Sequence, residues 1–277
     1  MITSIPSPFQ LPPAPGVLCV IVDASFAPDL QAQADRLVGY GAERCCPLFD
    51  NTRYAPLQSA GPHAVLCPDS PAFIDYASRL LEQADAGCVG YLEHELRFEQ
   101  AVEHWRSLLT VSTDDTSTQM MRFFDPRWLE PLLCSLDAAE LLRFMGPITD
   151  ITWRNELGWR HQARPASQAP FEVQPRGWLH LGHERQQQMD QCRLNLLAER
   201  FAQDYQAHLP SPEPVAFVYR QLLAAQQAGY VRLPEQERWL RLSLSKGDGF
   251  WRQRPQTELL ARDDLTLGDK LTELERL

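Results

Sequence analysis

Three charged residues stand where strands of the chain are expected to end, and their side chains could do acid–base chemistry. Asp23 follows the apolar run VLCVIV, and Arg122 and Asp125 lie inside the stretch MMRFFDPRWLEPLL. Ligands of parallel-type sheets bind beyond the carboxyl ends of the strands, so the two carboxylates could share a cleft. An acid or base in that cleft would need a perturbed pKa. A hydrolase or transferase that uses Asp23 and Asp125 is therefore one hypothesis for this chain.

The same residues have a structural interpretation, which we favour. Aspartate is a preferred N-cap residue and proline fits the first position of a helix, so Asp125 and Pro126 predict a joint where a strand becomes a helix. Arg122 would then bridge the strand-end carboxylates, and Arg127 completes the block RFFDPR. Inside the helix, Pro131 removes one hydrogen bond at a cost of about 3 kcal/mol, which predicts one turn, a kink and a restart.

Other motifs that could do chemistry are absent or weakly specific. The sequence contains no GxSxG, GxxxxGKS, GxxxxGKT or GxGxxG, which are the patterns of the common nucleophile, phosphate and dinucleotide loops. Ser243 to Lys246 match SxxK without its companion motifs, and we interpret this match as chance. His180, His183 and Glu184 form HxxHE, whose spacing differs from that of the zinc motif HExxH, and we interpret it as a solvated helix start. We expect no metal and no cofactor.

Cysteine usage and charge indicate where such a chain would work. The seven cysteines are an odd number at irregular spacing without CxxC, which argues against a disulfide framework and fits a reducing cytoplasm. The adjacent Cys45 and Cys46 are expected to be buried rather than redox-active. A net charge of −10 without a dense cluster of Lys and Arg disfavours a nucleic-acid partner. We read neither an export signal nor a membrane span from the sequence.

Strand and helix patterns alternate in the first half of the chain. Residues 17–22 predict a buried strand that is followed by a helix from Pro28, and residues 61–68 predict another strand. Ser70 and Pro71 then supply an N-cap and a first helical residue. Apolar residues from Phe98 to Leu109 recur at helical spacing. This order predicts a sheet with flanking helices.

Two further patterns surround the stretch that contains Arg122. The segments LLTVS and TQMMRFF flank a polar turn at Asp114, which predicts a hairpin. Beyond the Asp-Pro joint, Asp137 and Glu140 have the spacing of a capping box, and Gly146 followed by proline ends that helix. The predicted hairpin and helix therefore enclose the joint on both sides.

The second half of the chain is predicted to be helical. Residues 155–178 contain three prolines and no sustained period, which predicts a linker, and four amphipathic segments follow it. We therefore expect an α/β (α+β) lobe with a small mixed sheet and flanking helices, followed by an all-α lobe. The expected boundaries are an N-terminal tail over 1–16, the α/β lobe over 17–154, the linker over 155–178 and the helical lobe over 179–277.

The order of several blocks in the first half resembles a known family. IVDAS, CCPLFDNT, GPHAVLCP, GCVGYLEHELRFEQAVEHWRSLLTV, MMRFFDPRWLEPLL and LLRFMGPITDITW follow one another between residues 17 and 154. This order is similar to that of the bacterial type VI secretion effector chaperone (adaptor) family, and RFFDPR is its most specific element. Pro131 and the long segment after Asn155 depart from the family pattern.

The resemblance implies a function that the composition alone does not show. Members of the family are cytoplasmic adaptors without enzyme activity, which bind a toxic effector protein and help load it onto the spike protein of the secretion needle. The expected partners of this chain are therefore the effector and the spike, with no nucleic acid and no membrane. The absence of catalytic motifs agrees with this expectation.

A cluster of aromatic residues in the second half is the candidate for the effector-binding surface. The segment RWLRLSLSKGDGFWRQRP brings Trp239, Leu240, Phe250 and Trp251 together with four arginines. Tryptophan and arginine are enriched at interface hot spots. The alternative is that these aromatics are core residues that seal the helical lobe.

Overall fold

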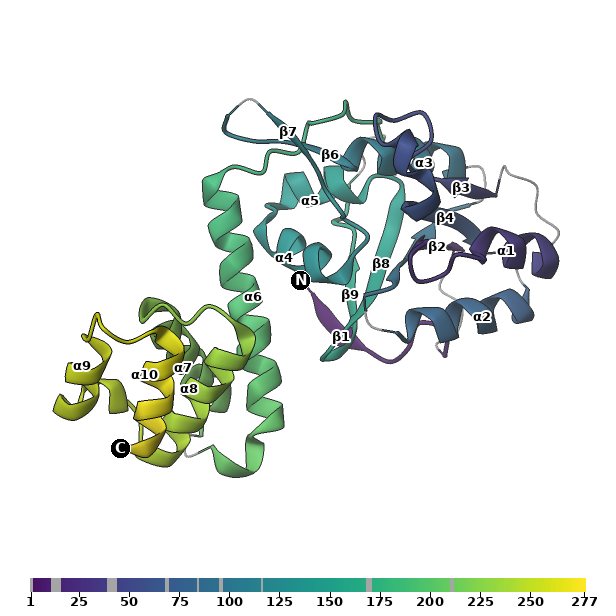
Figure 1. Ribbon diagram of the computed structural model, residues 1–277. Helices are drawn as coiled ribbons and strands as arrows, with labels where there is room; N and C mark the ends of the chain where they lie inside the picture. Colours follow the sequence, from purple (N-terminus) through teal and green to yellow (C-terminus); the bar gives the residue numbers. More distant parts are fainter. Residues whose placement is uncertain are drawn as a thin grey trace. The chain divides into compact units, whose positions relative to one another are not determined.

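Contacts divide the chain into two compact units, Met1–Met189 and Asp190–Leu277. The computed structural model describes residues 2–277 except 11–15, 39–43, 68–69, 84, 95–96, 116, 168–170 and 210–211. The first unit contains a sheet with helices, and the elements described in the second unit are all helical (Figure 1). The boundary between the units falls inside a helix rather than at residue 179.

A seven-stranded sheet forms the centre of the first unit, in the strand order β1-β9-β8-β5-β2-β4-β3. Every described pairing between strands of this sheet is antiparallel, so the expected mixed sheet is wrong. The helix α2 (Pro71–Leu81) connects β4 to β5, which run parallel to each other, but β2 lies between them and is antiparallel to both. The strands are β1 (Thr3–Ile5), β2 (Val17–Asp23), β3 (Cys45–Pro47), β4 (Pro62–Cys67), β5 (Gly87–Leu92), β8 (Ile148–Asn155) and β9 (Gly158–Ala163).

Helices cover both faces of this sheet (Figure 1). Successive side chains of a strand point to opposite faces, and in β2 the residues Cys19 and Ile21 join one core while Val20 and Val22 join the other. The first core includes residues of α3, α4 and α5, and the second includes residues of α1 and α2. These helices are α1 (Leu30–Val38), α2 (Pro71–Leu81), α3 (Phe98–Leu108), α4 (Pro126–Ser135) and α5 (Ala138–Met145), and a 3₁₀ helix, η1 (Ala55–Ala60), precedes β4.

The ends of the predicted first lobe both differ from the prediction. The expected tail over 1–16 contains β1, whose residue Thr3 pairs with His161 of β9; residues 11–15 of that tail lie outside the described part. The expected linker over 155–178 contains β9, which pairs with β8 from Asp150↔Ala163 to Asn155↔Gly158. Non-local pairing therefore recruits segments whose own sequence carries no strand period.

Local capping signals predict helix starts correctly. Ser70 accepts a hydrogen bond from the backbone N–H of Phe73, and Asp125 accepts one from that of Arg127. Asp137 forms the predicted capping box with Glu140. The predicted hairpin is also present, as β6 (Thr110–Ser112) paired with β7 (Thr118–Met120).

The predicted restart after Pro131 is wrong, because α4 continues from Pro126 to Ser135 as one helix with this proline inside it. Pro131 is buried together with its neighbours Leu129, Leu132 and Leu133. Packing of this apolar face against the sheet therefore offsets the missing hydrogen bond.

The second unit consists of helices around two apolar clusters. The predicted fourth segment forms two helices instead of one, because the polar stretch RDDLT separates them. No helix in the described part of the chain is long and apolar enough to cross a membrane. The helices are α6 (His183–Asp204), η3 (Gln206–His208), α7 (Pro214–Gln227), α8 (Leu233–Lys246), η4 (Phe250–Arg252), α9 (Arg254–Leu260) and α10 (Leu267–Arg276).

A buried histidine connects α3 to the end of α5. His104 is fully buried, and its Nε2 lies 2.7 Å from the carbonyl oxygen of Phe144. A carbonyl can only accept, so Nε2 carries the hydrogen, and Nδ1 has no hydrogen-bond partner among the described residues. Burial lowers the pKa of His104 to about 4. Gly146 ends α5 with φ of +57°, and a Cβ at this position would lie 2.5 Å from the His104 ring.

We predict that His104 makes the fold sensitive to mild acid. Between pH about 6.5 and about 4 the unfolded state binds a proton at this residue and the folded state does not, so the free energy of unfolding falls with decreasing pH, by up to about 3 kcal/mol. Urea unfolding at several pH values in this window, for the wild type and His104→Gln, would measure the effect. An equal pH dependence in both proteins would contradict the prediction.

Candidate functional site

The structure brings Asp23 and Asp125 together through one arginine. Asp23 ends β2 and is 1% exposed, and its carboxylate accepts hydrogen bonds from the Arg122 guanidinium and from the backbone N–H of Ser25, the latter at 2.9 Å. The Nε of the same arginine lies 3.5 Å from Asp125 Oδ2. Arg122 therefore bridges the two carboxylates, as the structural interpretation of the sequence predicts.

A second arginine completes the pairing of Asp125. This carboxylate is also 1% exposed, and Arg127 donates to its two oxygens from Nε at 2.9 Å and Nη2 at 2.7 Å. These hydrogen bonds raise the pKa of the Arg127 guanidinium, and Arg127 also lies 3.7 Å from Asp85 in the turn before β5. Burial raises the pKa of the Asp85 carboxyl. We call Asp23, Asp85, Arg122, Asp125 and Arg127 the strand-end clamp.

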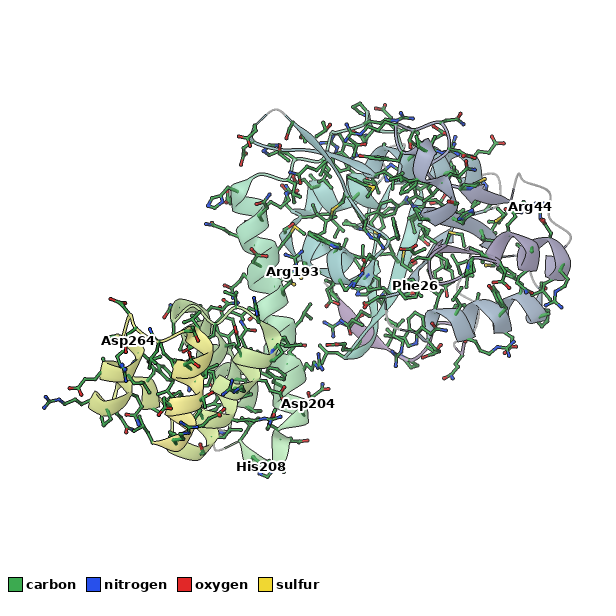
Figure 2. All side chains as sticks on the ribbon, in the orientation of Figure 1. Phe26, Arg44, Arg193, Asp204, His208 and Asp264 are labelled. Atoms are coloured by element: carbon green, nitrogen blue, oxygen red, sulfur yellow. The ribbon has the colours of Figure 1, made fainter. Side chains whose placement is uncertain are left out.

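The clamp has the chemistry of a structural joint. Two of its carboxylates, those of Asp23 and Asp125, are buried, and their oxygens accept hydrogen bonds from Arg122 and Arg127 inside the fold. The nearby cavity of 350 Å³ is lined by residues that include Ala24, Ala27 and His63, but Asp23 does not line it. Phe26 lies on the turn after Asp23 and is 39% exposed (Figure 2). The geometry therefore does not favour a hydrolase or transferase centred on Asp23 and Asp125.

A buried carboxylate that the sequence analysis missed lies next to this clamp. Glu130 of α4 is 1% exposed and accepts hydrogen bonds from Trp153 Nε1 at 2.9 Å, Asn155 Nδ2 at 2.7 Å and Arg160 Nε at 3.0 Å. It holds α4 against β8 and β9. The only local signal for a buried role of Glu130 is its position among the apolar side chains of Leu129 and its neighbours. The residues that donate hydrogen bonds to Glu130 belong to β8 and β9, which the sequence analysis did not predict.

The histidine motif is part of a polar clasp at the start of α6. Asp114 accepts hydrogen bonds from the backbone N–H of His183 at 2.7 Å and from His180 Nε2 at 3.0 Å. The Nδ1 of His180 lies 3.2 Å from Ser112 Oγ. His180 and Asp114 are more than half exposed, and no group of residues in the described ranges has the arrangement of a metal site. This agrees with the helix-start interpretation, with Asp114 as a cap supplied by the hairpin.

The other two candidate motifs are also part of the packing. Ser243 is 1% exposed and donates to Gln221 Oε1 at 2.8 Å, which connects α8 to α7. Burial raises the pKa of Cys45 to about 12 and also raises that of Cys46, so both thiols are protonated at neutral pH. None of the seven cysteines, all of which are described, forms a disulfide bond.

The proposed effector-binding aromatics are mostly core residues, which corrects the prediction. Trp239, Leu240 and Phe250 are each fully buried. The Trp239 ring packs 5.4 Å from Tyr230 and 5.0 Å from Phe250, measured between ring centroids. A helical unit of this size needs large side chains to build a core, and these residues supply it. Only Trp251 remains half-buried at the surface.

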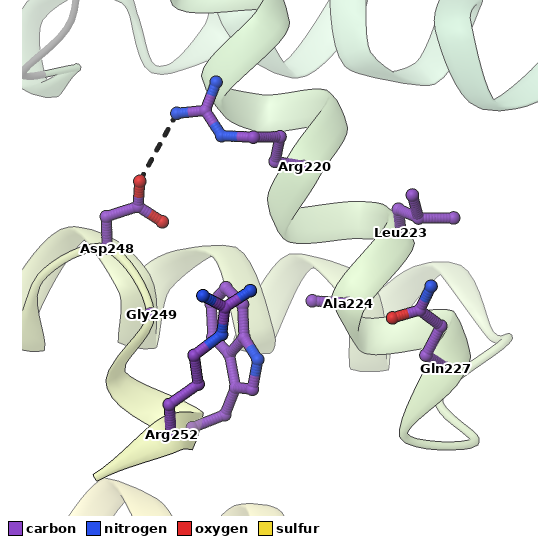
Figure 3. A pocket seen from close by; sticks show the side chains of 8 residues that line it. Arg220, Leu223, Ala224, Gln227, Asp248, Gly249 and Arg252 are labelled. Carbon is purple, nitrogen blue, oxygen red and sulfur yellow. Dashed lines mark hydrogen bonds and ion pairs between the residues drawn. The ribbon is translucent and has the colours of Figure 1, made fainter.

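Trp251 lines a cavity of 520 Å³ on the second unit (Figure 3). Arg220, Leu223 and Gln227 of α7 form one side of it, and Asp248 and Arg252 belong to the loop and to η4 opposite. In the sequence, this cavity is indicated only by the Gly-Asp-Gly turn and by Trp251. The residues of α7 that line its other side are distant from both in the chain.

Comparison with known proteins gives one match. A family model described as "Domain of unknown function (DUF4123)" matches residues 18–143, which is less than half of the chain. This family is associated with type VI secretion effector adaptors. The matched range begins in β2, includes every residue of the strand-end clamp and ends in α5. No curated protein and no solved structure matches this chain significantly.

We predict that breaking the clamp destabilises the first unit far more than breaking a surface ion pair. Arg122→Met leaves the buried carboxylate of Asp23 without its cation, which should lower the free energy of unfolding by about 2–3 kcal/mol, below the value for a fully buried pair because Arg122 is 37% exposed. The matched control is Arg79→Met, whose pair with Asp75 is exposed and should change stability by at most about 1 kcal/mol. Urea unfolding measures both, and similar losses would contradict the clamp.

Proposed function

We propose that this chain is a cytoplasmic adaptor without enzyme activity, which binds a toxic effector of a type VI secretion system and helps load it onto the spike protein. The observation that carries the proposal is the match of residues 18–143 to a family associated with such adaptors. The block RFFDPR, on which the resemblance of the sequence chiefly rests, lies within this range.

The structural roles of the charged residues support a function in binding rather than in catalysis. The carboxylates that could have been catalytic are buried and paired in the strand-end clamp, and the SxxK serine is bonded inside the helical packing. A chain that presents a folded surface to a partner needs these groups only to hold its elements in place. Specificity for one effector would then come from surface residues.

We expect the full-length chain, used as bait in a bacterium that carries the secretion system, to capture one toxin in stoichiometric amount together with a spike protein, because an adaptor must contact both. Affinity capture followed by mass spectrometry measures this, with the tag alone as the control. Deleting the gene should lower secretion of that toxin at least about tenfold without preventing needle assembly. Capture of neither protein would overturn the proposal.

We also expect Asp125→Asn to lower stability but to leave capture of the partner intact. Asparagine is a good N-cap residue, so α4 keeps its start, while the ionic bonds to Arg122 and Arg127 are weakened. Thermal unfolding and capture by the folded variant give the two readouts. Unchanged thermal stability combined with complete loss of capture would contradict the structural role of Asp125 and would favour a functional site at this residue.

A further inference from the structure

The cavity beside Trp251 is bordered by hydrogen-bond donors whose bonding capacity is not used. Arg252 is exposed and makes no ion pair with a described residue, and its guanidinium carbon lies 5.7 Å from the centroid of the Trp251 ring. The indole N–H of Trp251 has no hydrogen-bond partner among the described residues. Gln227 adds an exposed amide on the α7 side. Figure 3 shows the Arg252 side chain extending into the space between its own turn and α7.

The acceptor at the edge of this cavity is already occupied. Asp248 Oδ1 accepts from Gln221 Nε2 at 2.7 Å, and Oδ2 accepts from Arg220 Nη2 at 3.3 Å. These bonds, the one from Gln221 foremost, lower the pKa of the Asp248 carboxyl, which stays charged at neutral pH. Arg220 is thus paired with a carboxylate, whereas Arg252 is not paired with one among the described residues. The lining carries a net positive charge on a chain whose net charge is −10.

We propose that this cavity binds an acidic peptide segment of a protein partner, with a carboxylate on Arg252 and the Trp251 N–H and an adjacent apolar side chain against Leu223 and Ala224. Guanidinium groups form strong charge-assisted hydrogen bonds with carboxylates. The apolar wall on α7 distinguishes such a segment from a free inorganic anion, which has nothing to place there. A volume of 520 Å³ accommodates a few side chains. The identification of the partner rests on the proposed function, but the chemistry of the cavity does not.

The cavity can be tested directly with the purified full-length chain. We would follow the indole N–H signal of Trp251 by NMR, assigned with Trp251→Phe, during titration with N-acetyl-Leu-Glu-amide, its neutral analogue N-acetyl-Leu-Gln-amide and inorganic phosphate. The acidic dipeptide should shift the signal with a dissociation constant on the order of 1 mM, and the neutral one should bind at least about fivefold more weakly. No shift, equal binding of both dipeptides, or a shift with phosphate alone would overturn the proposal.

Two charge-reversal variants extend the test to the partner. Arg252→Glu should lose the dipeptide response and weaken capture of the partner at least about tenfold. The matched control is Arg232→Glu, which changes the net charge by the same amount at an exposed arginine of the same unit. The Arg232 side chain makes no hydrogen bond or ion pair with a described residue and lies outside the cavity, so this variant should bind as the wild type does. Unchanged thermal unfolding verifies that both variants fold.

The outcomes separate this proposal from the proposed function. If both variants capture the partner as the wild type does, the cavity is not the docking site, although the adaptor function stands. If the wild type captures no partner, the adaptor function fails and the dipeptide titration alone decides whether the cavity binds acidic peptides.

Discussion

The architecture of the first unit depends on one arginine that neutralises two buried carboxylates. Asp23 ends a central strand and Asp125 starts α4, so the charges of both would be costly in the interior without Arg122 between them. The pairing fixes where the segment after β7 crosses the end of β2. It also fixes the position of α4, whose Glu130 then reaches Trp153 and Arg160 on β8 and β9. The clamp and Glu130 together hold α4 to strands that lie far from it in the sequence.

The features that the sequence predicted correctly depend on short-range chemistry. Each of these features is a hydrogen bond between residues two or three positions apart, as in the N-caps at Ser70 and Asp125 and the capping box at Asp137. A short sequence motif therefore contains both the donor and the acceptor. The direction of the strands and the recruitment of β1 and β9 depend on which distant segments pair, and alternation of strand and helix does not determine this. The sequence therefore predicted the joint at Asp125 but not the antiparallel sheet that the joint serves.

The aromatic cluster shows a different limit of sequence reasoning. Residue types that dominate binding interfaces are the same ones that fill a small core, since both need large apolar surfaces. In the helical unit Trp239 and Phe250 lie inside and Trp251 at the edge, although all three belong to one short stretch. Trp251 also packs against Trp239, with 5.6 Å between the ring centroids, so only the burial of each side chain separates the core residues from the surface residue. The candidate surface therefore narrows from four residues to one tryptophan and the groups around it.

The two charged clusters differ in how fully their bonding capacity is used, and this difference indicates which of them can bind a partner. In the strand-end clamp the buried carboxylates are matched by Arg122 and Arg127, so a ligand could bind there only by displacing an internal bond at the cost of a buried charge. Beside Trp251 the carboxylate is matched by Arg220, while the donors of Arg252 face solvent. A ligand that supplies the missing acceptor there breaks no internal bond. A ligand that binds at this cavity therefore loses no binding energy to a rearrangement of the protein. For this reason we expect the helical unit, rather than the strand-end clamp, to recognise a partner, while the clamp maintains the fold.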